Sequence, residues 1–259
     1  MSDDVISDIR KDYLYHLVLK SERADGRSFE EYRKIQLEQE IIRKADGSAL
    51  VKLGNTQVMV GVKIQPGEPY SDSPNKGVII TNAELVPLAS PKFEPGPPNE
   101  VGIELARLVD RGVRESGALD LEALCITPGE KVWIIFIDIH ILDDCGNLMD
   151  AASLGAIAAL LTANVPAAQY GLGEDYPLPV RDIPLATTAV VLDDAIMFDP
   201  DTDEESVAET KLTVITTANG CICGMQKRGS GFLSSEQVYR IVDISCEMAN
   251  EIREKFLEV

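Results

Sequence analysis

The sequence predicts an α+β fold built from two pseudo-related halves, each of which packs helices on a sheet of mixed strands. Strand patterns and helix patterns follow one another in mixed order, unlike the regular alternation of a parallel doubly wound sheet. Apolar residues make up 45% of the 259 residues, which is enough for a sizeable core. The two halves share a loose order of strands and helices, although no sequence repeat is visible.

The first third of the chain predicts a helix, a turn, a strand meander and a loop. Residues 5–20 follow helical spacing at Val5, Ile9, Tyr13 and His16 or Leu17. "RADGR" (Arg23–Arg27) predicts a turn, because Asp-Gly favours one. Residues 33–63 carry β signals interrupted by "DGS" and "GNT", which predict antiparallel strands. Residues 64–98 are rich in proline and predict a long loop.

The middle of the chain predicts two helices around one strong strand. Residues 100–116 carry a helical apolar stripe at Val101, Leu105, Leu108, Val109 and Val113. "KVWIIFIDIHIL" (131–142) predicts a strand with one apolar face, formed by Trp133, Ile135, Ile137, Ile139 and Ile141. "DAASLGAIAALLTANVP" predicts a helix of small residues for which Asp150 is a natural N-cap.

The last third predicts short strands, an acidic segment and a final helix. The strands are expected near residues 187–192, 195–198, 211–217 and 221–225. Ser234 and Gln237 suit a capping box at the start of a helix over about 235–257. These elements predict an N-terminal helix and arm, a first domain and a second domain, over residues 1–30, 31–185 and 186–259.

The chain is strongly acidic, with a formal net charge of −19. RNA or DNA binding therefore requires a local basic patch or a partner that supplies one. Arg107, Arg111 and Arg114 form a stripe on one side of the helix predicted over residues 100–116. Guanidinium groups suit phosphate contacts. The alternative is pairing with carboxylates of the same helix, namely Glu104, Asp110 and Glu115.

The sequence predicts no metal, no cofactor and no membrane segment. Cys221 and Cys223 share a strand face, but only two histidines are present to complete a ligand set. The five irregularly spaced cysteines are typical of reduced thiols in a cytoplasmic protein. No leader pattern opens the sequence, and no apolar run is long enough to cross a bilayer.

The segment "FDPDTDEESVAETKL" (198–212) concentrates six carboxylates: Asp199, Asp201, Asp203, Glu204, Glu205 and Glu209. Three interpretations are open, namely a site for a divalent cation, the acid/base carboxylates of an enzyme, or a solvated loop. The segment lacks the spacing and the glycine of an EF-hand.

Several segments in order resemble the RNase PH family of phosphorolytic 3′→5′ exoribonucleases. The resemblance covers about residues 20–257 and rests on "RADGR", "ADGSALVKLGNTQVMVGV", "IELARLVDRGVRES" and the acidic segment. It implies the RNase PH-like fold. It also implies that the arginine stripe lies on the helix that faces RNA and phosphate in this family, with Arg107 and Arg111 favoured over Arg114.

The positions that carry catalysis in the family are altered in this sequence. The arginine of the phosphate-holding loop falls on Met149 and the next position on Asp150, while two aspartates six positions apart fall on Glu205 and Lys211. Phosphorolysis requires a held phosphate and a carboxylate that assists proton transfer or coordinates a metal. Met149 cannot hold phosphate, and Lys211 is expected to neutralise Glu205 or Glu209 instead. The sequence therefore predicts no catalytic residue.

"FEPGPP", "DCGNLMDAAS" and "DPDTDEES" narrow the resemblance to the non-catalytic RNase PH-like subunits of the archaeal exosome. This implies pairing with a catalytic RNase PH-like subunit, three such dimers in a hexameric ring, RNA-binding cap proteins, and single-stranded RNA threaded to the partner's active sites. Two alternatives remain open. One is an active exoribonuclease that uses Asp203, Glu204 and Glu205, and the other is a purely structural ring subunit without RNA contact.

Overall fold

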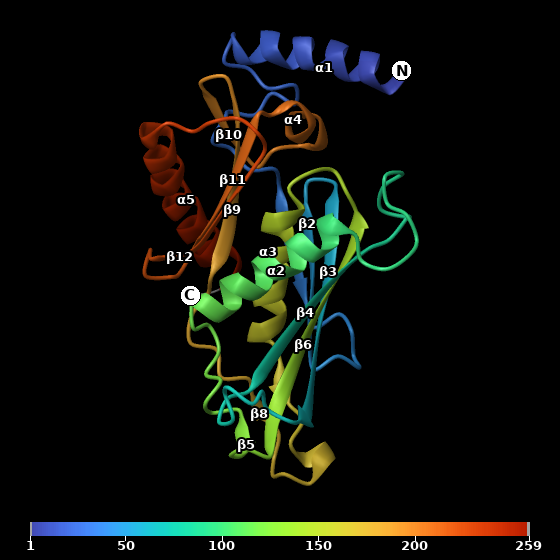
Figure 1. The fold of residues 1–259 in the computed structure, drawn as a ribbon, viewed down its shortest axis with the longest axis vertical. Helices are drawn as coiled ribbons and strands as arrows, with labels where there is room; N and C mark the ends of the chain where they lie inside the picture. Colours follow the sequence, from blue (N-terminus) through green and yellow to red (C-terminus); the bar gives the residue numbers. More distant parts are fainter. Residues whose placement is uncertain (1, 258–259) are drawn as a thin grey trace.

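The computed structural model describes the backbone of residues 2–257 and the side chains of residues 10–257. The chain is arranged in four layers, namely a helix, a four-stranded sheet, a pair of helices and a six-stranded sheet (Figure 1). The helices are α1 Ser2–Val18, α2 Glu100–Glu115, α3 Leu148–Leu161, α4 Thr202–Val207 and α5 Ser235–Phe256. The α+β class predicted from the sequence is confirmed.

The six-stranded sheet belongs to the first half of the chain and is mixed. Its order is β1-β2-β3-β6-β4, with the short β5 paired to the start of β6. Only β4 runs parallel to its neighbour β6, and the other described pairs are antiparallel. The strands are β1 Ile35–Gln39, β2 Gly47–Leu53, β3 Thr56–Gly67, β4 Val78–Leu85, β5 Cys125–Thr127 and β6 Lys131–Asp143. The predicted meander and the predicted apolar face of β6 are both present.

The prediction of a loop over residues 64–98 is wrong in its first part. β3 continues to Gly67, and residues 78–85 form β4 at the edge of the sheet. Ile79 and Ala83 of this strand are buried in the same core cluster as Leu105 of α2. The proline-rich composition of the surrounding residues obscured the strand. Its partner β6 comes much later in the chain, where local patterning gives no sign of it.

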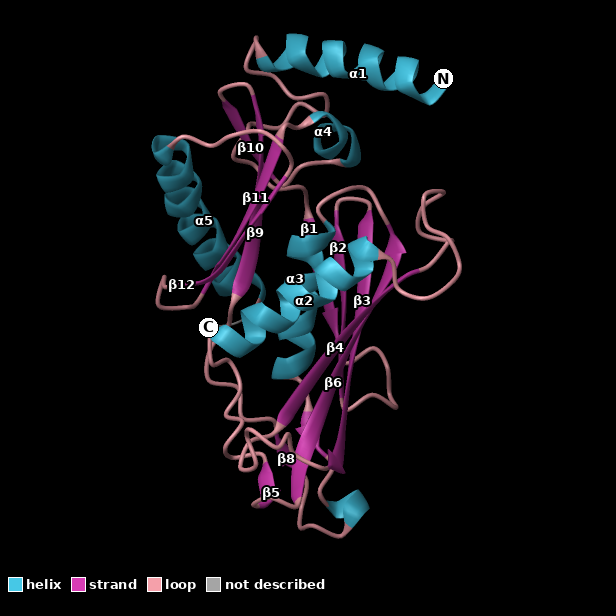
Figure 2. Cartoon of the chain, viewed as in Figure 1, coloured by secondary structure: helices cyan, strands magenta, loops and turns pink. Residues whose placement is uncertain are grey.

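The four-stranded sheet belongs to the second half and is antiparallel throughout, in the order β10-β9-β11-β12 (Figure 2). Every residue of β9 is buried, because α5 and α3 contact it from opposite faces (Figure 1). The strands are β9 Leu185–Leu192, β10 Ala195–Phe198, β11 Thr210–Thr216 and β12 Ile222–Arg228. Between the halves lie β7 Asn164–Val165, the 3₁₀ turn η1 Ala168–Tyr170 and β8 Tyr176–Pro177.

Helix α3 lies between the two sheets, and its composition explains how. All its side chains from Asp150 to Leu160 are buried, as expected for a helix that is apolar on every side. Its small residues let the sheet approach closely. A Cβ atom added at Gly155 would lie only 2.9 Å from Val60 Cγ2 of β3. A larger side chain here would push the first sheet away from the helical layer.

Helices α2 and α5 follow the sequence prediction closely. Leu105, Leu108, Val109 and Val113 of α2 are buried. Helix α5 begins at the predicted capping box, in which the Ser234 hydroxyl accepts from the Gln237 N–H (3.1 Å) and the Gln237 side chain accepts from the Ser234 N–H (2.9 Å). The two helices therefore start and face as their local sequence dictates.

Helix α1 is present, and Leu17 of the predicted stripe packs against the second sheet, but Tyr13 does not. Tyr13 is 57% exposed, whereas its neighbour Leu14 is buried and packs among residues of β9, β10 and α4, such as Val190 and Met197. The side chains of Val5 and Ile9, which belong to the predicted stripe, lie outside the described residues. Packing against the apolar end of the second sheet therefore determines which face of α1 points inward.

Candidate functional site

A cavity of about 490 Å³ lies where α2, the start of α3, α4 and the strands β11 and β12 meet. Three of the four altered positions singled out in the sequence line it, namely Met149, Glu205 and Lys211. The fourth, Asp150, is buried behind the cavity rather than in its lining. The fold thus brings α3, α4 and β11 together around one hollow, although they are separated in the sequence.

The acidic segment is partly helical rather than a solvated loop. Asp201 caps α4, since its side chain accepts from the Glu204 N–H (2.8 Å) and Glu204 accepts in return from the Asp201 N–H (2.9 Å). Carboxylates in the first turn of a helix interact favourably with its N-terminal amides. The interpretation of this segment as a solvated loop is therefore wrong for Asp199 and Glu204, which are almost completely buried.

The arginines of the N-terminal arm account for much of this buried acidity. Arg23 donates to both carboxylate oxygens of Glu204, at 2.8 and 2.5 Å, and both side chains are buried. Its guanidinium also donates to the Phe198 and Asp199 carbonyls, at 2.9 Å each. The pattern of "RADGR" predicts a turn and resembles a family motif, but neither feature indicates this ion pair. The opposite charge of this motif to the acidic segment was the one available signal for this pairing.

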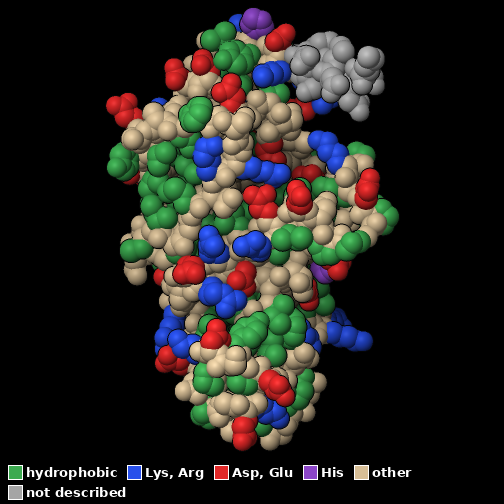
Figure 3. All heavy atoms as spheres, viewed as in Figure 1, with side chains coloured by type: hydrophobic (Ala, Val, Ile, Leu, Met, Phe, Trp, Pro, Cys, Tyr) green, Lys and Arg blue, Asp and Glu red, His purple; other side chains and the backbone are tan. Residues whose placement is uncertain are grey.

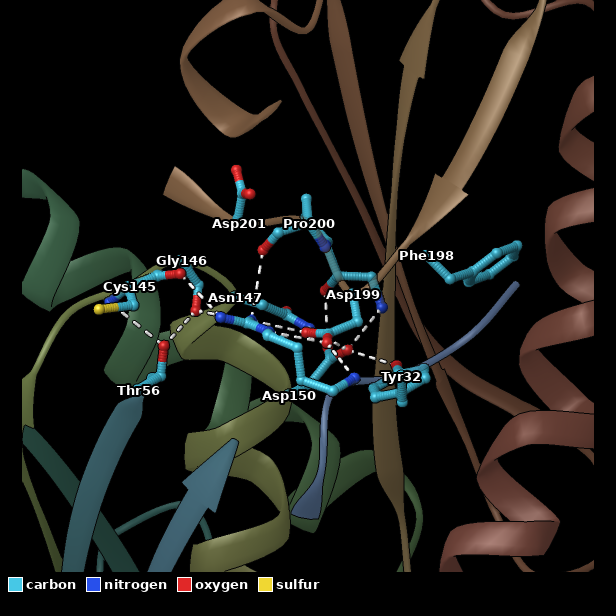
Figure 4. A network of polar contacts seen from close by, with 12 residues as sticks. Tyr32, Thr56, Cys145, Gly146, Asn147, Asp150, Phe198, Asp199, Pro200 and Asp201 are labelled. Carbon is cyan, nitrogen blue, oxygen red and sulfur yellow. Dashed lines mark hydrogen bonds and ion pairs between the residues drawn. The ribbon is translucent and has the colours of Figure 1, made fainter. Parts of the chain in front are cut away.

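The Asp199 carboxylate is the second buried acceptor in this region (Figure 4). It accepts from Arg33 at 2.7 and 2.8 Å, from Arg27 at 2.9 Å and from the Asn147 amide at 2.8 Å. Burial alone would raise the pKa of Asp199. The hydrogen bonds and charge of Arg33, together with the Asn147 bond, hold that pKa below its ordinary value. The carboxylate is therefore ionised at neutral pH and joins the arm to the second sheet.

Asp150 is not the N-cap of α3, which corrects the sequence prediction. The cap position belongs to Asn147, whose φ of 55° is left-handed, and its side chain makes no capping bond. The Asp150 carboxylate instead accepts from Tyr32 Oη (2.5 Å) and the side-chain amide of Asn147 (2.8 Å) (Figure 4). It also accepts from the Thr188 N–H (3.0 Å) and hydroxyl (2.7 Å). Burial raises the pKa of Asp150 to about 6, although these bonds oppose the rise.

Glu205 is the carboxylate that lies at the start of α3. Its Oε1 accepts from the Asn147 N–H at 3.3 Å and lies 2.8 Å from Lys211 Nζ. The sequence left open whether Lys211 would neutralise Glu205 or Glu209, and the structure pairs it with Glu205. The carboxylate and the ammonium group line the same cavity and neutralise each other there.

The remaining charges of the cavity are also largely balanced. Arg228 lies 3.3 Å from Glu104 of α2. Lys92 forms no ion pair with any residue whose side chain the structure describes. Burial raises the pKa of Asp144, and the nearby Glu205 charge adds to the rise. Three cations and three carboxylates therefore line a hollow whose remaining wall includes Met149, and no strong positive potential develops there.

The three predicted arginines of α2 are exposed but differ in their contacts. Arg114 donates to Asp110 at 3.0 and 3.1 Å and to the Ile79 carbonyl at 3.2 Å. Arg107 and Arg111 form no side-chain hydrogen bond or ion pair with the residues described by the structure. Figure 3 shows basic side chains gathered at the level of α2, with acidic side chains between them. Two guanidinium groups on this helix are therefore available to a ligand.

Neither a metal cluster nor a membrane span is found in the described part of the chain. No three histidine, cysteine or acidic side chains there converge on a common point in a way that could hold a metal ion. Cys221 is exposed, and burial raises the pKa of Cys223 to about 11, which disfavours its thiolate. No helix within residues 2–257 combines the length and apolar character needed to cross a bilayer.

The fold of two sheets, with a cavity at the altered catalytic positions, is that of a ribonuclease-like class of proteins. Comparison with known families agrees. The first domain of the 3′ exoribonuclease family, RNase PH, matches residues 31–166, and its second domain matches residues 182–248. The chain belongs to this family. The RNase PH-like fold predicted from the sequence is confirmed.

Among individual proteins, the chain is similar to components of archaeal exosomes. The chain is 61% identical to the exosome complex component Rrp42 of Methanocella arvoryzae, over 98% of both chains. It is 55% identical to the Rrp42 component of Archaeoglobus fulgidus over the whole of both. A solved Archaeoglobus fulgidus exosome with RNA bound to the active site contains a chain that matches with a TM-score of 0.95, 54% identity, and 97% and 99% coverage of the two chains. An archaeal exosome core matches with a TM-score of 0.92, 50% identity, and 99% and 100% coverage.

Proposed function

We propose that this chain is a subunit of an archaeal exosome core that has no active site of its own. It supports 3′-to-5′ phosphorolytic degradation of RNA by a catalytic RNase PH-like partner. The full-length similarity to Rrp42 exosome components supports the assignment to the complex. One observation carries the assignment as non-catalytic. The cleft holds Met149 and a Glu205–Lys211 ion pair at the positions where the family resemblance places a phosphate-binding arginine and two aspartates.

The chemistry of phosphorolysis explains why these substitutions matter. Inorganic phosphate must be held in line with the terminal phosphodiester, and a nearby carboxylate must assist proton transfer. Met149 carries no hydrogen-bond donor for a phosphate oxygen. Glu205 is engaged by Lys211 and by the backbone N–H of Asn147, so that its charge is already compensated. This chain then contributes shape and the local positive charge of its α2 arginines to the complex, while the partner performs the reaction.

We also propose the assembly in which the chain acts. Three dimers of this chain with its catalytic partner form a hexameric ring in the cytoplasm, and RNA-binding cap proteins sit on the ring. Arg107 and Arg111 of α2 contact the backbone of single-stranded RNA, whereas Arg114 is engaged by Asp110. The chain divides into an arm over residues 1–30 and domains over 31–185 and 186–259. Contacts with the phosphate backbone make the RNA interaction independent of sequence and sensitive to salt.

A reconstitution experiment tests the assignment. The purified chain, the catalytic partner and the assembled complex are each incubated with single-stranded RNA and inorganic phosphate, and released nucleoside diphosphates are measured. We expect release from the complex and none from this chain alone. Sizing of the chain with and without the partner shows whether the two associate. Nucleoside diphosphates produced by this chain alone would refute the non-catalytic assignment.

A further inference from the structure

Three cationic side chains line the cavity beside Met149, namely Lys92, Lys211 and Arg228. Several cations around one hollow normally attract anions. In this cavity, however, carboxylates of the chain itself lie against two of them. Glu205 Oε1 is 2.8 Å from Lys211 Nζ, and Glu104 Oε2 is 3.3 Å from Arg228. The loss of an arginine at the Met149 position is thus not the only feature that opposes phosphate binding.

We propose that Glu205 is a built-in anion that keeps inorganic phosphate and nucleotide phosphates out of this cavity. Its carboxylate takes the hydrogen bond from the Asn147 N–H and the charge of Lys211, which are the two donors that a phosphate oxygen would need. The inference rests on the proposed function and deepens it. Met149 removes a phosphate ligand, whereas Glu205, one methylene longer than the aspartate that the family resemblance places there, occupies the remaining donors as a permanent competitor.

The position of Glu205 is fixed by contacts outside the cavity. The preceding residue, Glu204, is held by the buried Arg23 and by the capping box with Asp201. Glu205 therefore leaves a short helix whose start cannot easily move. A tethered carboxylate held in this way competes at a high effective concentration, without loss of translational freedom. Free phosphate would have to displace it while bearing repulsion from the same charge.

The experiment measures binding of inorganic phosphate to the full-length chain by isothermal titration calorimetry. We expect Glu205→Ala to bind phosphate at least about tenfold more tightly than the natural chain, because the backbone N–H of Asn147 and the Lys211 ammonium group become free. Asp203→Ala is the matched control. Asp203 lies on the same helix, half exposed and paired with Arg10 outside the cavity, and its replacement changes the net charge equally. The control should leave phosphate affinity unchanged.

Two further variants locate the effect and guard against misfolding. Lys211→Ala added to Glu205→Ala should abolish the gained affinity. Glu205→Gln keeps the side-chain size and removes only the charge, and we expect it also to raise phosphate affinity. The test therefore does not depend on whether the α4 segment tolerates alanine. The proposal fails if neither Glu205 variant gains affinity, if Asp203→Ala gains as much, or if the natural chain binds as tightly. Because this assay uses neither RNA nor a partner, such a failure leaves the assignment as a ring subunit standing.

Discussion

Asp150 shows how a single residue changes its role between sequence and structure. It stands in the first turn of α3, where a carboxylate usually serves the helix amides. Here it binds Tyr32, which precedes β1, and Thr188 of β9 instead. The residue therefore joins the helical layer to the second sheet. Its burial has a measurable consequence, since the pKa of its carboxyl rises from 3.8 to about 6.

The raised pKa of Asp150 predicts a specific dependence of stability on pH. The folded state holds the proton more tightly than the unfolded state, so stability is greatest below pH 4 for this group and falls as pH rises towards 6. We compare unfolding by urea for the natural chain and for Asp150→Asn, which cannot titrate. Relative to the variant, the free energy of unfolding of the natural chain should fall by roughly 3 kcal/mol across this window.

The comparison with the variant isolates Asp150 from its neighbour. Asp199 acts in the opposite sense, because its lowered pKa contributes stability that is lost only as the pH drops below its ordinary value of 3.8. Both proteins retain Asp199, so its contribution largely cancels in the difference. A difference in unfolding free energy that stays constant between pH 4 and 7 would contradict the assignment of this pKa to Asp150.

At the scale of the element, α2 has one face that packs in the core and another that is exposed and carries arginines. Leu105 and Val109 enter the core, while Arg107 and Arg111 point away from it and remain without partners among the described side chains. The pattern of the helix was readable in the sequence. The distinction between Arg114 and the other two arginines depends on Asp110, four positions earlier on the same helix, and on the Ile79 carbonyl of β4. Only the second of these contacts required the structure.

We expect Arg107→Glu with Arg111→Glu to leave assembly of the reconstituted ring intact and to weaken RNA binding and degradation. A charge-assisted phosphate contact contributes about 1–3 kcal/mol, so the loss of affinity should be about tenfold or more. RNA affinity is measured over a series of salt concentrations, where the dependence on salt should also become shallower.

The control for this helix reverses the same number of charges elsewhere. Arg43 and Lys44 are exposed in the turn between β1 and β2, so Arg43→Glu with Lys44→Glu changes the net charge equally. This control should bind and degrade RNA like the natural complex. If the α2 variant also assembles, binds and degrades at natural levels, a purely structural role for the chain is the better description.

At the scale of the whole molecule, the buried polar contacts tie the two sheets and the arm into one body. Asp199 follows β10 and is held by Arg27 of the arm and by Arg33, which precedes β1, while Asn147 beside α3 donates to the same carboxylate. Removing one partner from such a buried ionic network leaves the other charges uncompensated, which costs about 3–5 kcal/mol. The division into domains at residue 185 stays a prediction, and these contacts bear on how independently the parts can unfold.

We expect the chain to unfold in a single cooperative transition. Trp133 is the only tryptophan in the sequence, and it is buried in β6 of the first sheet, so its fluorescence reports on the first half. Far-ultraviolet circular dichroism reports on both halves. The two signals should change at the same urea concentration in the natural chain. Two separate transitions by circular dichroism, with fluorescence following only one, would show that the halves unfold independently.

The sequence by itself determined the elements whose pattern is local. The stripes of α2 and α5, the Ser234 cap and the alternating face of β6 each depend on residues a few positions apart. The altered catalytic positions were also readable, because they required only the order of motifs along the chain. Position alone identified Met149, Glu205 and Lys211, and the structure gathers them in one cavity.

Only the tertiary structure decided which distant groups meet. It placed β4 beside β6, turned Asp150 towards Thr188, and joined Arg23 to Glu204 across 181 positions of the chain. The physical reason is that a buried charge or a parallel strand is stabilised by a partner far away in the sequence, and local periodicity contains no information on that partner. For the same reason, the hydrogen bond from the Asn147 N–H at the start of α3 to Glu205 could be identified only from the tertiary structure.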